Sequence, residues 1–119
     1  MKIEIKRNKG SAAILITFDT VKENFESASE RNRFFWELYG RKQVVIKDSG
    51  RYEYDREGLM DEIPHLKVSD SVFIIMQEHM KRMMQFFDEW EDKVEFDTFP
   101  VILNKKRLHE LEESEVESE

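Results

Sequence analysis

The chain has 119 residues, no cysteine and a formal net charge of −7, and its length is typical of a single domain. The absence of Cys excludes disulfides, thiolate nucleophiles and cysteine-ligated zinc or iron–sulfur sites. No apolar run approaches the roughly 18 residues that cross a bilayer, and the first ten residues lack the apolar region of a signal peptide. We therefore expect a cytoplasmic protein with no membrane segment.

The charge is unevenly distributed along the chain. Residues 1–51 carry eleven Lys and Arg against seven Asp and Glu, whereas residues 52–119 carry eight against nineteen. Six of the later acidic residues lie between Glu110 and Glu119, where little can be buried. Because this composition is typical of disordered chain, we expect one domain over residues 1–109 and a disordered acidic tail over residues 110–119.

Two strands are predicted near the N-terminus. Charged and apolar residues alternate over residues 2–6, and a turn-forming segment follows over residues 7–10, which predicts an extra N-terminal hairpin strand. The next run, Ala12 to Phe18, is almost wholly apolar and ends at Asp19. Such a run is typical of a strand in the centre of a sheet.

A helix follows, capped by Ser27 or Ser29 and ended by Gly40, which suits the left-handed position after a helix. Its apolar side chains share one face, and they are Phe34, Phe35, Leu38 and Tyr39. Trp36 lies about 100° around the helix from Phe35, so it falls at the edge of this face. We regard Trp36 as a candidate subunit contact.

A second hairpin is predicted over residues 43–55. Residues 43–47 (QVVIK) and 51–55 (RYEYD) flank a turn at residues 48–50, and the return strand places Tyr52 and Tyr54 on one side. The next short apolar stretch stops at Pro64, which cannot continue a helix or a central strand. No definite element is predicted over residues 56–70.

The second half begins with a buried strand over residues 71–76 and a helix with a wide apolar face. That face consists of Met80, Met83, Met84, Phe87 and Trp90. A last strand over residues 93–103 is expected to be interrupted near Pro100, and Asn104 can cap a short charged helix before the tail.

The order of these segments predicts an α+β fold, a ferredoxin-like β-α-β-β-α-β sandwich with an extra N-terminal hairpin strand and an acidic C-terminal tail. Such a sheet leaves an edge strand that a second copy can pair with or cover. We therefore expect a homodimer.

Asp19 is the first candidate for chemistry. A carboxylate just past a buried strand lies at the edge of the sheet, where it could hold a hard cation such as Mg²⁺. One carboxylate is a poor magnesium site unless a second copy or a phosphate completes it. The alternative is that Asp19 accepts hydrogen bonds from the amides of Val21 or Lys22 and serves as a turn residue, which is the interpretation that we favour.

Three short motifs invite a comparison with a known family. The sequence Ile16-Thr17-Phe18-Asp19, the arginine-bearing helix that ends in Leu38-Tyr39-Gly40, and Ser71-Val72-Phe73 at the start of a strand resemble the small ferredoxin-like subunit of the CRISPR adaptation complex. The resemblance implies a homodimer that contacts duplex DNA and holds a metal between two copies of Asp19. The chain departs from the family in the thirty or so residues between Gly40 and Ser71 and in Ile74, where the family often has glutamate.

The second candidate is a basic and aromatic segment over residues 31–54. Its cations and rings could contact phosphates and stack on bases, and they are Arg31, Arg33, Arg41, Lys42, Lys47, Arg51, Tyr52 and Tyr54. The alternative is a solvated face, because the chain as a whole is acidic and cations near a helix C-terminus also suit the helix dipole.

Other chemistry is not indicated. The three histidines, His65, His79 and His109, have no metal-ligand spacing, and the chain has no glycine-rich phosphate loop and no G-x-S-x-G motif. We therefore favour a small interaction module that engages nucleic acid or a partner protein over an enzyme. The alternatives are a metal-dependent nuclease that uses paired Asp19 residues and a structural or regulatory protein-binding subunit.

Overall fold

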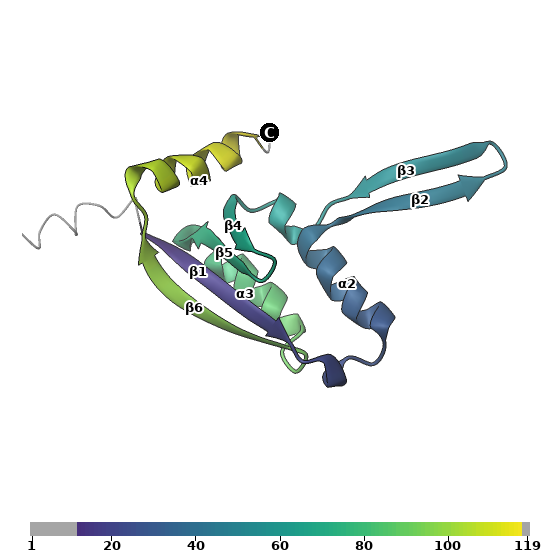
Figure 1. The fold of residues 1–119 in the computed structure, drawn as a ribbon, viewed down its shortest axis with the longest axis horizontal. Helices are drawn as coiled ribbons and strands as arrows, with labels where there is room; N and C mark the ends of the chain where they lie inside the picture. Colours follow the sequence, from purple (N-terminus) through teal and green to yellow (C-terminus); the bar gives the residue numbers. More distant parts are fainter. Residues whose placement is uncertain (1–11, 118–119) are drawn as a thin grey trace, which may run out of the picture.

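The computed structural model describes residues 12–117 and has an α+β fold with six strands in two antiparallel sheets and three α-helices. The N-terminal hairpin strand that we expected over residues 2–6 lies outside the described residues. Figure 1 shows a domain around the larger sheet and a long two-stranded arm that projects from it.

The larger sheet has the order β4-β5-β1-β6. β1 (Ala12–Thr20) is an interior strand, paired on one side with β5 (Val72–Met76) and on the other with β6 (Val94–Ile102). β4 (His65–Ser69) pairs with the outer edge of β5. The prediction of a central strand over residues 12–18 is confirmed.

Two helices cover one face of this sheet. α2 (Ala28–Tyr39) contributes Phe34 and Leu38 to the core, and α3 (Met80–Glu89) contributes Met83, Phe86 and Phe87. They meet the side chains that alternate inward along β1 and β5, namely Ile16, Phe18, Phe73 and Ile75. The two predicted apolar helix faces are confirmed, although the α3 face also includes Phe86, which lies outside the predicted set.

The centre of this core is aromatic. The ring of Phe18 lies 5.7 Å from those of Phe34 and Phe87, and Phe87 stacks on Phe96 of β6 at 4.7 Å. Ring pairs of this kind add about 0.5–1.5 kcal/mol each to their burial. They tie β1 to both helices and β6 to α3.

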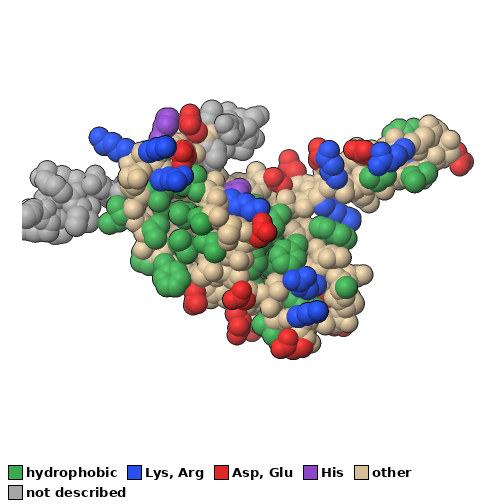
Figure 2. All heavy atoms as spheres, viewed as in Figure 1, with side chains coloured by type: hydrophobic (Ala, Val, Ile, Leu, Met, Phe, Trp, Pro, Cys, Tyr) green, Lys and Arg blue, Asp and Glu red, His purple; other side chains and the backbone are tan. Residues whose placement is uncertain are grey.

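The opposite face of the sheet has an apolar end and an acidic end. Strand register aligns one row across it, consisting of Leu66, Ile74, Leu15 and Phe99. Phe99 is half exposed, and Figure 2 shows hydrophobic side chains gathered on this part of the surface. Toward the other end of β1, Asp19 pairs directly with Glu95.

The region between the two helices differs from the prediction. It holds four strands, where two or three were expected. β2 (Arg41–Lys47) and β3 (Gly50–Arg56) form a separate sheet, which we call the arm, while β4 completes the main sheet. β4 has only five residues and three of them are exposed, so it carries little apolar signal.

The last strand also differs. β6 runs unbroken through Pro100, where we expected an interruption. Among the described strands β6 pairs only with β1, and an edge strand tolerates Pro because the missing N–H can face outward.

The acidic C-terminal segment, expected to be disordered from residue 110, is helical to Glu117 in α4 (Lys105–Glu117). Asn104 caps it as predicted, since its Oδ1 accepts from the Arg107 amide at 2.9 Å. Leu111 is fully buried, and the composition of the segment concealed this apolar anchor.

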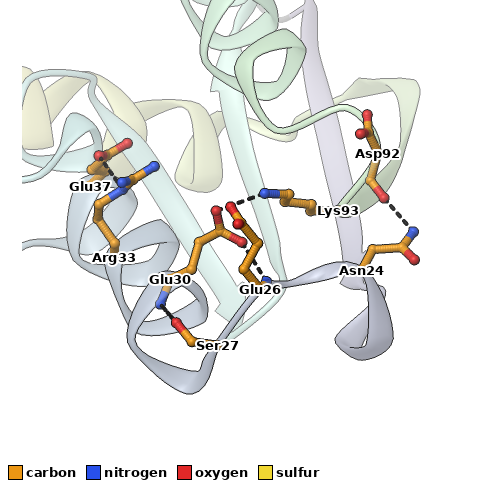
Figure 3. A network of polar contacts seen from close by, with 8 residues as sticks. All are labelled: Asn24, Glu26, Ser27, Glu30, Arg33, Glu37, Asp92 and Lys93. Carbon is orange, nitrogen blue, oxygen red and sulfur yellow. Dashed lines mark hydrogen bonds and ion pairs between the residues drawn. The ribbon is translucent and has the colours of Figure 1, made fainter.

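A polar network fixes the start of α2 (Figure 3). The Ser27 hydroxyl caps the helix by accepting from the Glu30 amide at 3.1 Å. The Glu30 carboxylate accepts from Lys93 Nζ at 2.7 Å and from the Glu26 amide at 2.8 Å. Because Lys93 directly precedes β6, this ion pair joins α2 to the far edge of the sheet.

We predict that Met83→Ala lowers the free energy of unfolding by roughly 2–5 kcal/mol, because Met83 is fully buried between α3 and the sheet. Urea unfolding at neutral pH measures this loss. Lys81→Ala, on the exposed side of the same helix, is the control and should change stability little. Equal effects of the two substitutions would contradict the packing of α3.

The Glu30 network predicts a pH dependence. The hydrogen bond from Lys93, followed by that from the Glu26 amide, holds the pKa of Glu30 below its ordinary value of 4.5. A depressed pKa stabilises the native state above the unfolded pKa, and that stability is lost as pH falls through the folded pKa. Glu30→Gln should therefore be less stable at neutral pH and should lose less stability than wild type below about pH 4.5.

Unfolding midpoints measured across the acid range test this expectation. Glu89→Gln replaces an exposed carboxylate of α3 and serves as the control. Parallel acid-unfolding curves for wild type and Glu30→Gln would exclude the ion pair as a determinant of acid stability.

Candidate nucleic-acid interface

The arm leaves the domain at a crossing of two backbone segments. Gly40 ends α2 with a φ of 82°, and its amide donates to the Trp36 carbonyl oxygen at 2.7 Å. The returning chain passes so close that a Cβ atom at Gly58 would lie 2.2 Å from the Gly40 nitrogen. A Cβ atom at Gly40 would lie 2.5 Å from the Arg56 carbonyl oxygen. Both positions therefore require glycine.

Polar contacts surround this crossing. The Gly58 amide donates to Asp61 Oδ2 at 2.7 Å, and the Tyr39 hydroxyl donates to the Asp70 carbonyl oxygen. Burial, with a smaller effect of the Asp70 charge, raises the pKa of Tyr39 to about 12. Tyr39 is therefore a protonated donor at neutral pH, and it ties the end of α2 to the β4–β5 turn.

The arm itself is a regular antiparallel ribbon from Arg41 to Arg56. Its pairing alternates the side chains between two faces. One, which we call the basic-aromatic face, consists of Arg41, Gln43, Val45, Lys47, Gly50, Tyr52, Tyr54 and Arg56. No residue that the register places on this face is acidic.

Cations and rings alternate along the basic-aromatic face. The Arg41 guanidinium lies 3.9 Å from the ring centroid of Trp36 at the end of α2. Farther out, Arg56 lies 5.3 Å from the Tyr54 ring and Lys47 lies 5.5 Å from the Tyr52 ring. Each of the three rings is between 37% and 39% exposed, so each retains surface for a ligand.

The other face of the arm is electrically balanced. It carries Lys42, Val44, Ile46, Arg51, Glu53 and Asp55. Glu53 pairs with Arg51 at 2.9 Å and lies 4.0 Å from Lys42. Two of the predicted binding residues, Lys42 and Arg51, are therefore on the wrong face of the arm to act with the tyrosines.

Arg31 and Arg33 are not part of this row. They lie in the first half of α2, roughly 10–15 Å along the helix from the arm at 1.5 Å per residue. Arg31 stacks on Phe35 at 5.2 Å, and its Nη2 is 3.5 Å from Thr20 Oγ1. Arg33 pairs with Glu37 at 3.4 Å and lies over the Trp90 ring. Both have partners within the domain.

Sequence reasoning missed two members of the row. Arg56 lies just beyond the hairpin predicted over residues 43–55, although its position two residues after Tyr54 is the signal that puts it on the same face of β3. Trp36, a candidate subunit contact in the sequence, contacts Arg41 instead, and that contact depends on how β2 turns away from α2. The structure brings together Arg41, Lys47, Tyr52 and Tyr54 of the predicted set.

Asp19 lies on the face of the main sheet opposite to α2 and α3. Its side chain is exposed in a shallow hollow that also includes Glu95 and Asp97 of β6. The Val21 amide donates to the Lys93 carbonyl oxygen at 2.8 Å, and no side chain caps the 3-10 turn Lys22–Asn24. The expected hydrogen bond from the Val21 amide to Asp19 is replaced by this bond to the chain leading into β6, and the absence of a side-chain cap leaves the alternative donor, the Lys22 amide, without a bond to Asp19.

Within residues 12–117, no cluster of three or more His, Asp or Glu side chains has a geometry that could hold a metal ion. The three histidines lie on different elements, β4, the 3-10 turn before α3, and α4, and His65 bonds to the Ile63 carbonyl oxygen at 2.8 Å. The described helices include none long and apolar enough to cross a membrane.

Comparison with protein-family models, with curated proteins and with solved structures finds no match to this chain. The arm and the hollow at Asp19 are therefore interpreted from their own residues.

Proposed function

We propose that this protein is a small interaction module that binds nucleic acid through the basic-aromatic face of the arm. The observation that carries the proposal is a row of three cation–aromatic pairs. Two lie on the basic-aromatic face, where the register places no carboxylate, and the third joins Arg41 of that face to Trp36 of α2. Phosphates attract the cations, and bases stack on the rings. This mechanism needs no catalytic group.

The two arginines at the root of the arm support the same function. Arg41 and Arg56 are direct cross-strand partners on one face, and like charges in that position destabilise a ribbon. A bound phosphate would relieve this repulsion. Although the chain is acidic overall, residues 41–56 carry five Lys and Arg against three Asp and Glu. The acidic residues of the arm strands lie on the opposite face.

For the domain, we propose a ferredoxin-like arrangement with the arm inserted between the first helix and the second strand of the main sheet. The order β4-β5-β1-β6, with α2 and α3 on one face, supports this assignment. A relation to the small subunit of the CRISPR adaptation complex would then concern the four-stranded domain and Asp19, and the arm would be an addition to it.

A homodimer and a metal-dependent nuclease remain a second proposal. Asp19 is exposed beside Glu95 and Asp97, on the sheet surface whose other end bears the apolar row. A second copy stacked on the apolar row would bury the half-exposed Phe99. If that stacking also brought two Asp19 side chains together, the carboxylates could hold Mg²⁺, which prefers oxygen ligands.

We predict that Lys47→Ala combined with Arg56→Ala weakens binding of a fluorescently labelled oligonucleotide for all sequences tested. It should flatten the salt dependence of the affinity by about one unit for each phosphate that the variant no longer neutralises. Fluorescence anisotropy at several salt concentrations measures both quantities.

The matched control is Lys42→Ala combined with Arg51→Ala, which removes the same two residue types from the other face of the arm. It should change affinity much less. Equal losses would indicate that net charge, and not the basic-aromatic face, determines binding. No measurable affinity in wild type would favour a protein-binding subunit, for which the exposed Val44 and Ile46 offer an apolar contact.

A further inference from the structure

We infer that the basic-aromatic face, together with Trp36 at the end of α2, binds single-stranded nucleic acid by stacking bases on Trp36, Tyr54 and Tyr52. This inference rests on the proposed function and names the class of its ligand. It contrasts with the insertion of the arm as a β-ribbon into the major groove of a duplex, which the width of that groove would also permit.

The centre of the face has the wrong chemistry for reading a duplex. A ribbon in the major groove reads base edges with polar side chains, and bidentate Arg, Asn and Gln are the usual readers. Here the central side chains are Val45, Tyr52 and Tyr54. The one amide, Gln43, uses its oxygen to accept from Arg56 Nε at 2.6 Å. The groups left for base edges at the centre of the face are the Gln43 amide nitrogen and the tyrosine hydroxyls, while Arg41, Arg56 and Lys47 lie at its two ends.

The rings instead suit bases that are already unstacked. In a duplex the faces of the bases are covered by their neighbours, so a protein ring can stack only on a base that is free. Tyr52 and Tyr54 are two residues apart on one strand, so their side chains rise from the same face about 6.6 Å apart. Trp36 extends this row beyond the root of the arm through its contact with Arg41.

The cations hold the rings and remain available to phosphates. Each ring has a cation over it, and the Tyr52 hydroxyl also lies 2.7 Å from Ser49 Oγ. These contacts restrict the side chains before a ligand arrives, which lowers the entropy cost of binding. A strand lying along the arm could therefore place a base on each ring and a phosphate beside each cation.

The experiment compares three probes of equal length, an oligo-dT, an oligo-U and a mixed-sequence DNA duplex, by anisotropy with the full chain. We expect either single strand to bind at least ten-fold more tightly than the duplex. Tyr52→Leu combined with Tyr54→Leu should weaken single-strand binding roughly ten-fold or more, because stacking on each ring contributes substantially to affinity. Tyr52→Phe combined with Tyr54→Phe keeps the rings and should retain most of the affinity.

Tryptophan fluorescence gives an independent readout. Trp36 is partly exposed whereas Trp90 is 3% exposed, so oligo-dT should quench the emission of Trp36. Trp36→Phe should abolish the quenching. Duplex binding as tight as single-strand binding, an unaffected Leu double variant, or quenching that persists in Trp36→Phe would overturn the inference and leave the proposed function standing. A failure of wild type to bind any of the three probes would overturn both.

Discussion

Gly40 and Gly58 bring two backbone segments into contact at the point where the chain leaves α2 and returns from β3. Neither segment could carry a side chain there without moving the other. The chain leaves the domain and returns to it at this crossing, so the arm lies outside the domain. None of the residues from Arg41 to Glu57 contributes to the buried core. The position of the arm, and therefore the accessibility of both its faces, depends on these two glycines.

An isolated two-stranded ribbon is only marginally stable in water, so contacts between its own side chains must stabilise the arm. On the balanced face, ion pairs of Glu53 compensate the cations. On the basic-aromatic face, aromatic rings lie beside the cations, and the register places no carboxylate on this face. The resulting surface offers positive charge and flat apolar area together, which is the combination used by proteins that bind single-stranded nucleic acid.

The sequence predicted the individual helices and strands better than the way in which they pack together. The strands Ala12–Thr20 and Val72–Met76 and both core helices carry strong apolar patterns, because they bury large side chains. The arm was predicted as a hairpin, but its separation from the main sheet follows from the Gly40–Gly58 crossing, which joins residues far apart in the sequence. The five-residue β4 and the Leu111 anchor of α4 depend on tertiary contacts that no local pattern reveals. The division of the basic residues within each arm strand follows from local alternation and was readable in the sequence, whereas the alignment of Arg41 with Arg56 on one face needed the strand register.

The most direct test of this account is to excise the arm. The backbones of Gly40 and Gly58 are in contact, so Gly40 can be joined directly to Gly58 to remove residues 41–57. Oligonucleotide binding and chemical unfolding of this shortened protein should then be compared with those of the full chain. We predict an unchanged cooperative unfolding transition and a complete loss of binding. A folded, shortened protein that still binds, or a domain that no longer folds, would contradict the description of the arm as a separate binding element.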